Sequence, residues 1–117
     1  MKKLKTKLQR SETQVNVEKM FFALFNPDTG VKYVYIKEDD TLYATEDGTP
    51  ETTHLSFSQN ETGMHIYLHH GSWNREEWEE YVIRRNQVFL NSWKTEVTVE
   101  ELQDKLMDVY NENFKKS

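Results

Sequence analysis

The chain has 117 residues, of which 36% are hydrophobic and 13% aromatic, and it carries a net charge of −5. This length and composition predict a single domain with a compact core. The sequence has no cysteine, which excludes a disulfide framework and cysteine-ligated zinc and is typical of the reducing cytoplasm. Neither a signal peptide nor an apolar stretch of membrane-spanning length is visible, so we expect no membrane partner.

Charged residues divide the chain into two parts. Five of the first ten residues are basic and none is acidic: Lys2, Lys3, Lys5, Lys7 and Arg10. This pattern predicts a basic N-terminal arm over residues 1–12, either flexible or a short helix that is too small to be stable alone. All 20 acidic residues follow this basic cluster. We therefore predict that residues 13–117 form a single domain with an acidic body.

The first part of this domain has the pattern of β-structure. Residues 13–17 alternate between apolar and polar, and Met20–Phe25 is a nearly continuous apolar run, as in a strand buried on both faces. Asn26–Gly30 favours a turn because proline, aspartate and glycine each suit a turn position. Val31–Lys37 alternates again, so the sequence predicts a β-hairpin over residues 20–37.

A second hairpin is predicted further along the chain. A turn at residues 38–40 and a loop at residues 46–50 bound a short strand, Leu42–Thr45. His54–Ser58 and Met64–His69 then place apolar residues on one face and histidine, serine and tyrosine on the other. This alternation is typical of an antiparallel sheet with one face on the core and the other in solvent.

The stretch from Trp73 to Trp93 is the longest amphipathic run in the chain. Its apolar residues follow a helical spacing and are Trp78, Tyr81, Val82, Val88, Phe89 and Trp93. Asn74 with Glu77 resembles a capping box, and Trp73 with Trp78 fits a hydrophobic staple. These three signals agree, and together they predict one helix that covers the sheet.

Two alternatives for the last third of the chain lead to different folds. Tyr81–Arg85 and Gln87–Leu90 also fit two short strands. We prefer the helix because the capping box, the hydrophobic staple and the helical spacing of the apolar residues agree with one another. A second helix is predicted from Thr98, which forms a capping box with Glu101. The resulting fold class is α+β, with an N-terminal antiparallel sheet of about four to five strands and two C-terminal helices packed on one face.

A three-residue motif resembles the catalytic triplet of aspartic proteases. Asp28, Thr29 and Gly30 match it, but the resemblance covers these residues only. In that family the triplet follows an apolar strand and is supported by a second glycine-containing apolar motif. Here Asn26 and Pro27 precede the triplet and no partner motif follows. We interpret the motif as hairpin turn chemistry.

Other catalytic patterns give no stronger signal. His65 and His69 share a strand face, but four residues at about 3.3 Å each separate them too far to share one metal ion. His54 can add a second ligand, whereas a metal site needs three or four. The four glycines form no phosphate-binding loop. We therefore expect no enzyme activity, no metal and no cofactor. The alternative is a small hydrolase or metal-dependent enzyme that uses the histidine face.

Tyrosines on the predicted sheet could form a surface on which bases stack. They are Tyr33, Tyr35, Tyr43 and Tyr67. Nucleic-acid platforms interleave basic residues with the aromatic ones, and only Lys32 and Lys37 are nearby. Direct binding of nucleic acid is therefore not our expectation for the sheet, and a regulator that uses the basic arm remains an alternative function.

Acidic clusters are the candidate partner-binding residues. They are Glu38, Asp39, Asp40, Glu46, Asp47, Glu76, Glu77, Glu79 and Glu80. An acidic body favours basic partners and imitates a phosphate track. The leading hypothesis is a small cytoplasmic binding protein that occludes a host protein with a basic, nucleic-acid-binding surface. Phage or mobile-element inhibitors of host defence, such as anti-CRISPR proteins, are the concrete version of this class.

Overall fold

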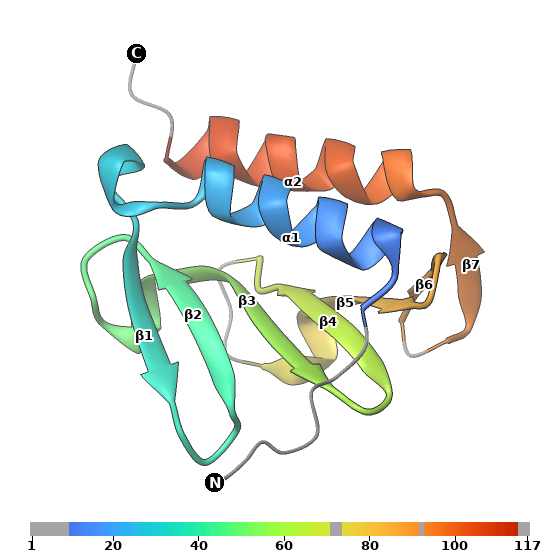
Figure 1. The fold of residues 1–117 in the computed structure, drawn as a ribbon. Helices are drawn as coiled ribbons and strands as arrows, with labels where there is room; N and C mark the ends of the chain where they lie inside the picture. Colours follow the sequence, from blue (N-terminus) through green and yellow to red (C-terminus); the bar gives the residue numbers. More distant parts are fainter. Residues whose placement is uncertain (1–9, 71–73, 92, 115–117) are drawn as a thin grey trace, which may run out of the picture.

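The computed structural model describes residues 10–70, 74–91 and 93–114. These residues form one sheet and two α-helices, α1 (Glu12–Leu24) and α2 (Val99–Asn113), which lie on the same face of the sheet (Figure 1). Each strand is antiparallel to the next, and the sheet order is β1 (Lys32–Ile36), β2 (Thr41–Thr45), β3 (Thr53–Asn60), β4 (Gly63–Leu68), β5 (Glu79–Arg84), β6 (Gln87–Leu90) and β7 (Thr95–Val97). Three short 3-10 helices, η1 (Pro27–Thr29), η2 (Pro50–Thr52) and η3 (Arg75–Glu77), lie in connecting segments.

This arrangement corrects the predicted fold. The described residues form a seven-stranded sheet rather than one of four to five strands. The two helices come from opposite ends of the chain, with α1 before the first strand and α2 after the last. The prediction of two C-terminal helices is therefore wrong, and the two errors behind it concern residues 12–25 and 73–93.

Residues 12–24 form a helix where strands were predicted. Ser11 accepts a hydrogen bond from the backbone of Gln14, whose side chain accepts one from the backbone of Ser11, and this is a complete capping box. Val17, Phe21 and Phe25 follow at four-residue spacing, and all three are fully buried. The sequence did not reveal this helical spacing, because residues 13–17 alternate like a strand and Met20–Phe25 is a nearly continuous apolar run. In such a run the buried helix positions cannot be separated from their apolar neighbours.

Residues 79–84 and 87–90 form strands where a helix was predicted, so the two-strand alternative is correct. Arg84 pairs with Gln87 across a two-residue turn, in which Arg85 has a left-handed backbone with φ +57°. Asn74 does cap, but it caps only the single turn η3. Branched Val82 and Ile83 favour a strand, and apolar residues on both faces of β5 produced the apparent helical stripe.

Two other predictions are confirmed. The β3–β4 hairpin pairs Phe57 with Ile66 and Leu55 with Leu68, as the alternation of the sequence indicates. The final helix begins after Thr98, whose side-chain oxygen accepts a hydrogen bond from the backbone of Glu101 at 3.1 Å. Both signals are local in sequence, which explains why they could be recognised.

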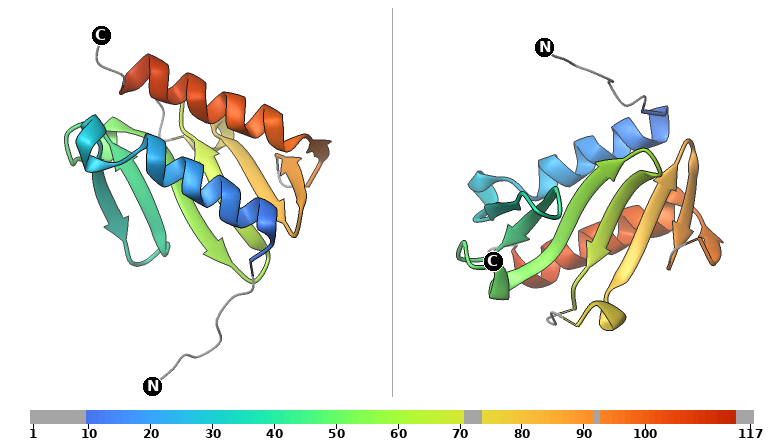
Figure 2. Two further views of the ribbon diagram at one scale, coloured as in Figure 1. Left: turned by 45° about the horizontal axis from the view of Figure 1, so that its top comes forward. Right: turned by 90° about the horizontal axis from the view of Figure 1, so that it is seen from below.

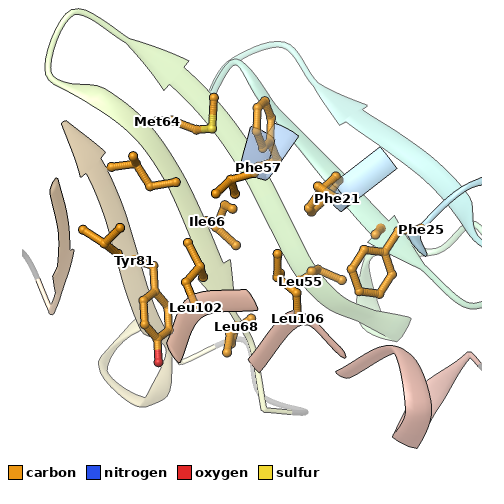
Figure 3. Packing of buried hydrophobic residues seen from close by; sticks show 14 of the residues in the cluster. Phe21, Phe25, Leu55, Phe57, Met64, Ile66, Leu68, Tyr81, Leu102 and Leu106 are labelled. Atoms are coloured by element: carbon orange, nitrogen blue, oxygen red, sulfur yellow. The ribbon is translucent and has the colours of Figure 1, made fainter. Parts of the chain in front are cut away.

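The core lies between the helices and the sheet (Figure 3). It is built from Phe21 and Phe25 of α1, Leu102 and Leu106 of α2, and strand residues that include Leu55, Phe57, Ile66, Leu68 and Tyr81. Polar contacts fix the start of α1 on the β5–β6 hairpin. The Gln14 amide donates to the Ile83 carbonyl at 2.6 Å, and the Thr13 backbone donates to the Asn86 side chain at 3.2 Å.

The first prediction uses two adjacent phenylalanines of α1. Phe21 is fully buried, whereas Phe22 is 36% exposed. Replacing Phe21 with alanine should lower the free energy of unfolding by about 3–5 kcal/mol, and Phe22→Ala should cost much less. Urea denaturation of both variants measures the difference. Equal losses at the two positions would contradict the helix, because a strand buried on both faces would need both side chains.

Candidate functional site

One face of the sheet has no α-helix on it in the described part of the chain (Figure 2, right). Because successive residues of a strand point to opposite faces, packing of Leu55 and Phe57 against the helices sends Ser56 and Ser58 to the other side. The register places further side chains beside them on that face, namely Tyr43, His65, Tyr67, Glu80, Val82 and Phe89. We call this surface the helix-free face.

Trp78 lies across the helix-free face. It follows η3 and is only 9% exposed. Its ring lies 3.8 Å from the ring of His69, centroid to centroid, and 5.9 Å from that of Tyr67. The Arg75 guanidinium lies 5.0 Å from the centre of the Trp78 ring and is ion-paired with Asp39 at 3.7 Å. The segment with η3 thus connects the β1–β2 turn with β4.

Two hollows lie beside Trp78. The smaller, of about 160 Å³, is lined by Asp39, Arg75, Trp78 and five residues with hydroxyl groups, Thr41, Tyr43, Ser56, Ser58 and Tyr67. We call it the hydroxyl hollow. The larger, of about 430 Å³, is lined by Tyr67, Arg75, Trp78 and the charged residues Glu76, Glu80 and Lys94. Tyr67, Arg75 and Trp78 line both hollows. The same two aromatic rings and one guanidinium therefore border both polar spaces.

The tyrosine hydroxyls of this face remain neutral donors over the physiological pH range. Burial, and secondarily the Glu80 carboxylate, raise the pKa of Tyr67 to about 12. Burial, and then the charge of Asp39, also raise the pKa of Tyr43 above its ordinary value. The Tyr43 hydroxyl donates to the Asp39 carboxylate at 3.3 Å. The hydroxyl hollow is therefore lined by neutral polar groups, one carboxylate, one guanidinium and the Trp78 ring.

His65 links a turn to the neighbouring strand through two hydrogen bonds. Its Nδ1 lies 2.8 Å from a Glu80 oxygen, and its Nε2 lies 2.8 Å from the Thr62 hydroxyl oxygen. This order of hydroxyl, imidazole and carboxylate has the geometry of a catalytic triad. However, Thr62 also lies 2.5 Å from the Asn60 amide oxygen, which already accepts from the Thr62 backbone.

The hydroxyl of Thr62 is already used within its own turn. It donates to the Asn60 amide oxygen, which also accepts from the Thr62 backbone. We therefore interpret this network as a link between the β3–β4 turn and β5, made through His65 and Glu80.

The other histidines have separate surroundings. His54 contacts Glu46 at 2.5 Å, and His70 contacts Glu79 at 3.0 Å. His69 is 1% exposed, with its Nε2 2.9 Å from the Ser56 hydroxyl, and burial lowers the pKa of its imidazole to about 3. Within the described ranges, no group of three or more histidine, aspartate or glutamate residues could hold a metal ion. The predicted histidine face is thus divided among four sites.

The structure brings some predicted partner-binding residues together. Asp39 of the β1–β2 turn lies with Arg75 on the helix-free face, and Glu76 and Glu80 line the larger hollow. Four more acidic residues extend this group or lie beside it in sequence, namely Glu38, Asp40, Glu77 and Glu79. Of these, Asp40 accepts a hydrogen bond from the Tyr35 hydroxyl at 2.6 Å.

Other predicted residues have different positions. The register places Glu79 opposite Leu68, on the helix side of the sheet. Glu46 and Asp47 lie in the β2–β3 loop, at the opposite end of β2 from Asp39. The Asp47 carboxylate accepts hydrogen bonds from Thr49 and Thr52 of the same loop, which stabilise the loop and lower the pKa of the carboxyl. The predicted acidic clusters therefore do not form one surface.

Three residues of the helix-free face were not among the predicted site residues. They are Tyr67, Arg75 and Trp78. The alternation of residues Met64–His69 predicted that Tyr67 lies on the solvent face of the sheet, and this was the one sequence feature that pointed to its position. Arg75 was hidden because its contact with Asp39 depends on a long-range arrangement of the chain. Trp78 was assigned to a helix stripe, so its position over His69 could not be expected.

The aspartic-protease triplet has the local structure of a turn. Asp28 lies in η1, where its backbone donates to the Asn26 side chain at 2.8 Å. Gly30 has a left-handed backbone with φ +91°, which glycine adopts without a steric cost. The turn is confirmed, but the predicted hairpin over residues 20–37 is wrong, because this turn joins α1 to β1 rather than two strands.

Comparisons with protein-family models, with curated proteins and with solved structures found no match to this chain. A search of the described residues for membrane-spanning helices also found none that is sufficiently long and apolar. The candidate site is therefore characterised by its own geometry, which consists of a polar and aromatic sheet face with carboxylates at its border.

The second prediction concerns pH. Between pH 6.5 and 3 the unfolded chain binds a proton at His69 that the folded protein does not bind, because burial lowers the pKa to about 3. The free energy of unfolding should therefore fall as the pH drops below 6.5, by up to about 1.4 kcal/mol per pH unit from this group.

Urea denaturation between pH 7 and 4 measures this dependence. His69→Gln should reduce the slope, even though it also lowers stability at pH 7. His70→Gln is the matched control, because His70 is exposed, and it should keep the wild-type contribution of His69. Identical slopes for wild type and His69→Gln would contradict a neutral, buried His69.

Proposed function

We propose that this protein binds a basic protein partner through its helix-free face and acts by occluding the partner's surface. The observation that carries the proposal is the combination of the aromatic residues Tyr67 and Trp78 with carboxylates at the two hollows. Tryptophan and tyrosine are among the residues that most often dominate binding energy in protein interfaces. Carboxylates around such a centre favour a partner rich in lysine and arginine.

The charge distribution supports a basic partner. All 20 acidic residues lie in the described part of the chain. On the helix-free face, Asp39 keeps 42% of its side chain exposed even with Arg75 beside it. Partly exposed carboxylates attract a positively charged protein over distance and raise its association rate, particularly at low salt.

The proposed mode of action is steric. A basic surface that binds nucleic acid would meet carboxylates in place of phosphates, and the aromatic centre would add apolar contact area. Phage-type inhibitors of cytoplasmic host defence act in this general way, so they are the class that we propose for this protein. No chemical step is required, because blocking depends only on affinity and coverage.

Charge reversal on the helix-free face tests the proposal and is our third prediction. A variant with Asp39, Glu76 and Glu77 changed to lysine should bind the partner about tenfold or more weakly. A control variant with Asp104, Asp108 and Glu112 changed to lysine alters net charge equally on exposed positions of α2. It should keep most of the affinity, because α2 lies on the other side of the sheet.

The experiment uses a partner captured from host lysate by the wild-type chain and then purified. Affinities of both variants are measured across salt concentrations, and circular dichroism checks that each variant is folded. The partner's own binding to nucleic acid is measured with and without the wild-type chain. Equal losses for the two variants, or unchanged nucleic-acid binding by the partner, would contradict occlusion through this face.

A further inference from the structure

The hydroxyl hollow has the chemistry of a site for a guanidinium group. Such a group is planar and cationic, stacks on aromatic rings and donates to oxygen acceptors. In the hollow, Trp78 supplies the ring, Asp39 a carboxylate, and Tyr43, Ser58 and Tyr67 are among the groups that supply hydroxyl oxygens. The volume of about 160 Å³ is suited to the end of one side chain and not to a larger ligand.

In the free protein the chain's own Arg75 lies at the border of the hydroxyl hollow and already contacts both Trp78 and Asp39. Its guanidinium lies 5.0 Å from the centre of the Trp78 ring and 3.7 Å from the Asp39 carboxylate. Its side chain is nevertheless 64% exposed, and that of Asp39 is 42% exposed. Exposed ion pairs of this kind contribute about 0–1 kcal/mol, so a competing group can displace Arg75 at small cost.

We propose that an arginine side chain of the basic partner enters the hydroxyl hollow and replaces Arg75 over Trp78. This inference rests on the proposed function, because it takes the partner to be basic. The incoming guanidinium stacks on Trp78, pairs with Asp39 and donates to the surrounding hydroxyl oxygens. Lysine fits less well, because its ammonium group is compact and strongly hydrated and cannot form a planar stack.

Arg75 then acts as an internal competitor. While its guanidinium lies at Asp39, a fraction of molecules is unable to bind the partner's arginine, and the apparent affinity is reduced by that fraction. Removal of Arg75 should therefore strengthen binding of arginine, although it also removes a residue from the interface. An ordinary contact residue would show the reverse effect, because its removal would weaken binding.

A small probe tests the inference on the free, full-length protein and is our fourth prediction. Acetyl-arginine N-methylamide is titrated into the protein, and the indole N–H signal of Trp78 is followed by NMR. We expect a saturable shift that acetyl-lysine N-methylamide reproduces more weakly. Arg75→Ala should tighten arginine binding by about two- to fivefold, which corresponds to the free energy of an exposed ion pair. Asp39→Asn should abolish the saturable shift.

Arg84→Ala is the matched control. Arg84 also lies over an indole ring, 5.9 Å from the centre of Trp93, and its removal changes net charge equally. Its loss should leave arginine affinity unchanged, which separates displacement at the hollow from a general effect of charge. Tighter binding by both variants would contradict the proposed competition by Arg75.

Two other outcomes would overturn the inference. The first is the absence of saturable arginine binding to both wild type and Arg75→Ala, or weaker arginine binding to Arg75→Ala than to wild type. The second is saturable binding of inorganic phosphate that is lost in Arg75→Ala, because the hollow would then be an anion site with Arg75 as its ligand. Neither outcome depends on the captured partner, so failure here is distinguishable from failure of the proposed function.

Discussion

The alternation of side chains in the β3–β4 hairpin is the constraint on which the rest of the structure depends. Phe57 and Ile66 pair on one side of the hairpin, and Ser58 and His65 pair on the other. A shift of this register by one residue would exchange the two sets and bury the polar one under the helices. The same pairing therefore fixes the core and the composition of the helix-free face.

The two faces of the sheet are covered by different elements. On the core side, α1 and α2 bury large apolar side chains, and this burial is the dominant favourable term in folding. On the other side, the η3 segment covers only part of the sheet, with the Trp78 ring tilted against the His69 ring. Partial cover explains the two hollows, because the strands carry polar side chains that Trp78 and Arg75 do not fully enclose.

Sequence patterns predicted the elements that depend on local signals. The β3–β4 hairpin follows from period-two alternation, and the start of α2 follows from Thr98 and Glu101. The errors arose where apolar residues occur on both faces of an element. Around Phe21 a helix resembled a buried strand, and around Val82 a strand resembled an amphipathic helix, because periodicity cannot separate short apolar runs.

The candidate site was less predictable than the fold. Acidic residues were recognised from composition, but their grouping depends on how strands and turns are placed in space. Asp39 and Arg75 meet through a long-range arrangement that no short motif indicates. Glu79 and Glu80 are neighbours in sequence, yet alternation sends them to opposite faces. Separating the acidic residues of the helix-free face from the others therefore required the strand register.

The central claim is that the helix-free face is the binding surface. The most direct test is methyl and amide NMR of the labelled protein with the captured basic partner. Amide shift changes should gather on the partly exposed residues Tyr67, Glu80 and Phe89, while Met107 on the outer side of α2, which is 40% exposed, should be unaffected. Changes centred on Met107 and absent from the helix-free face would contradict the claim.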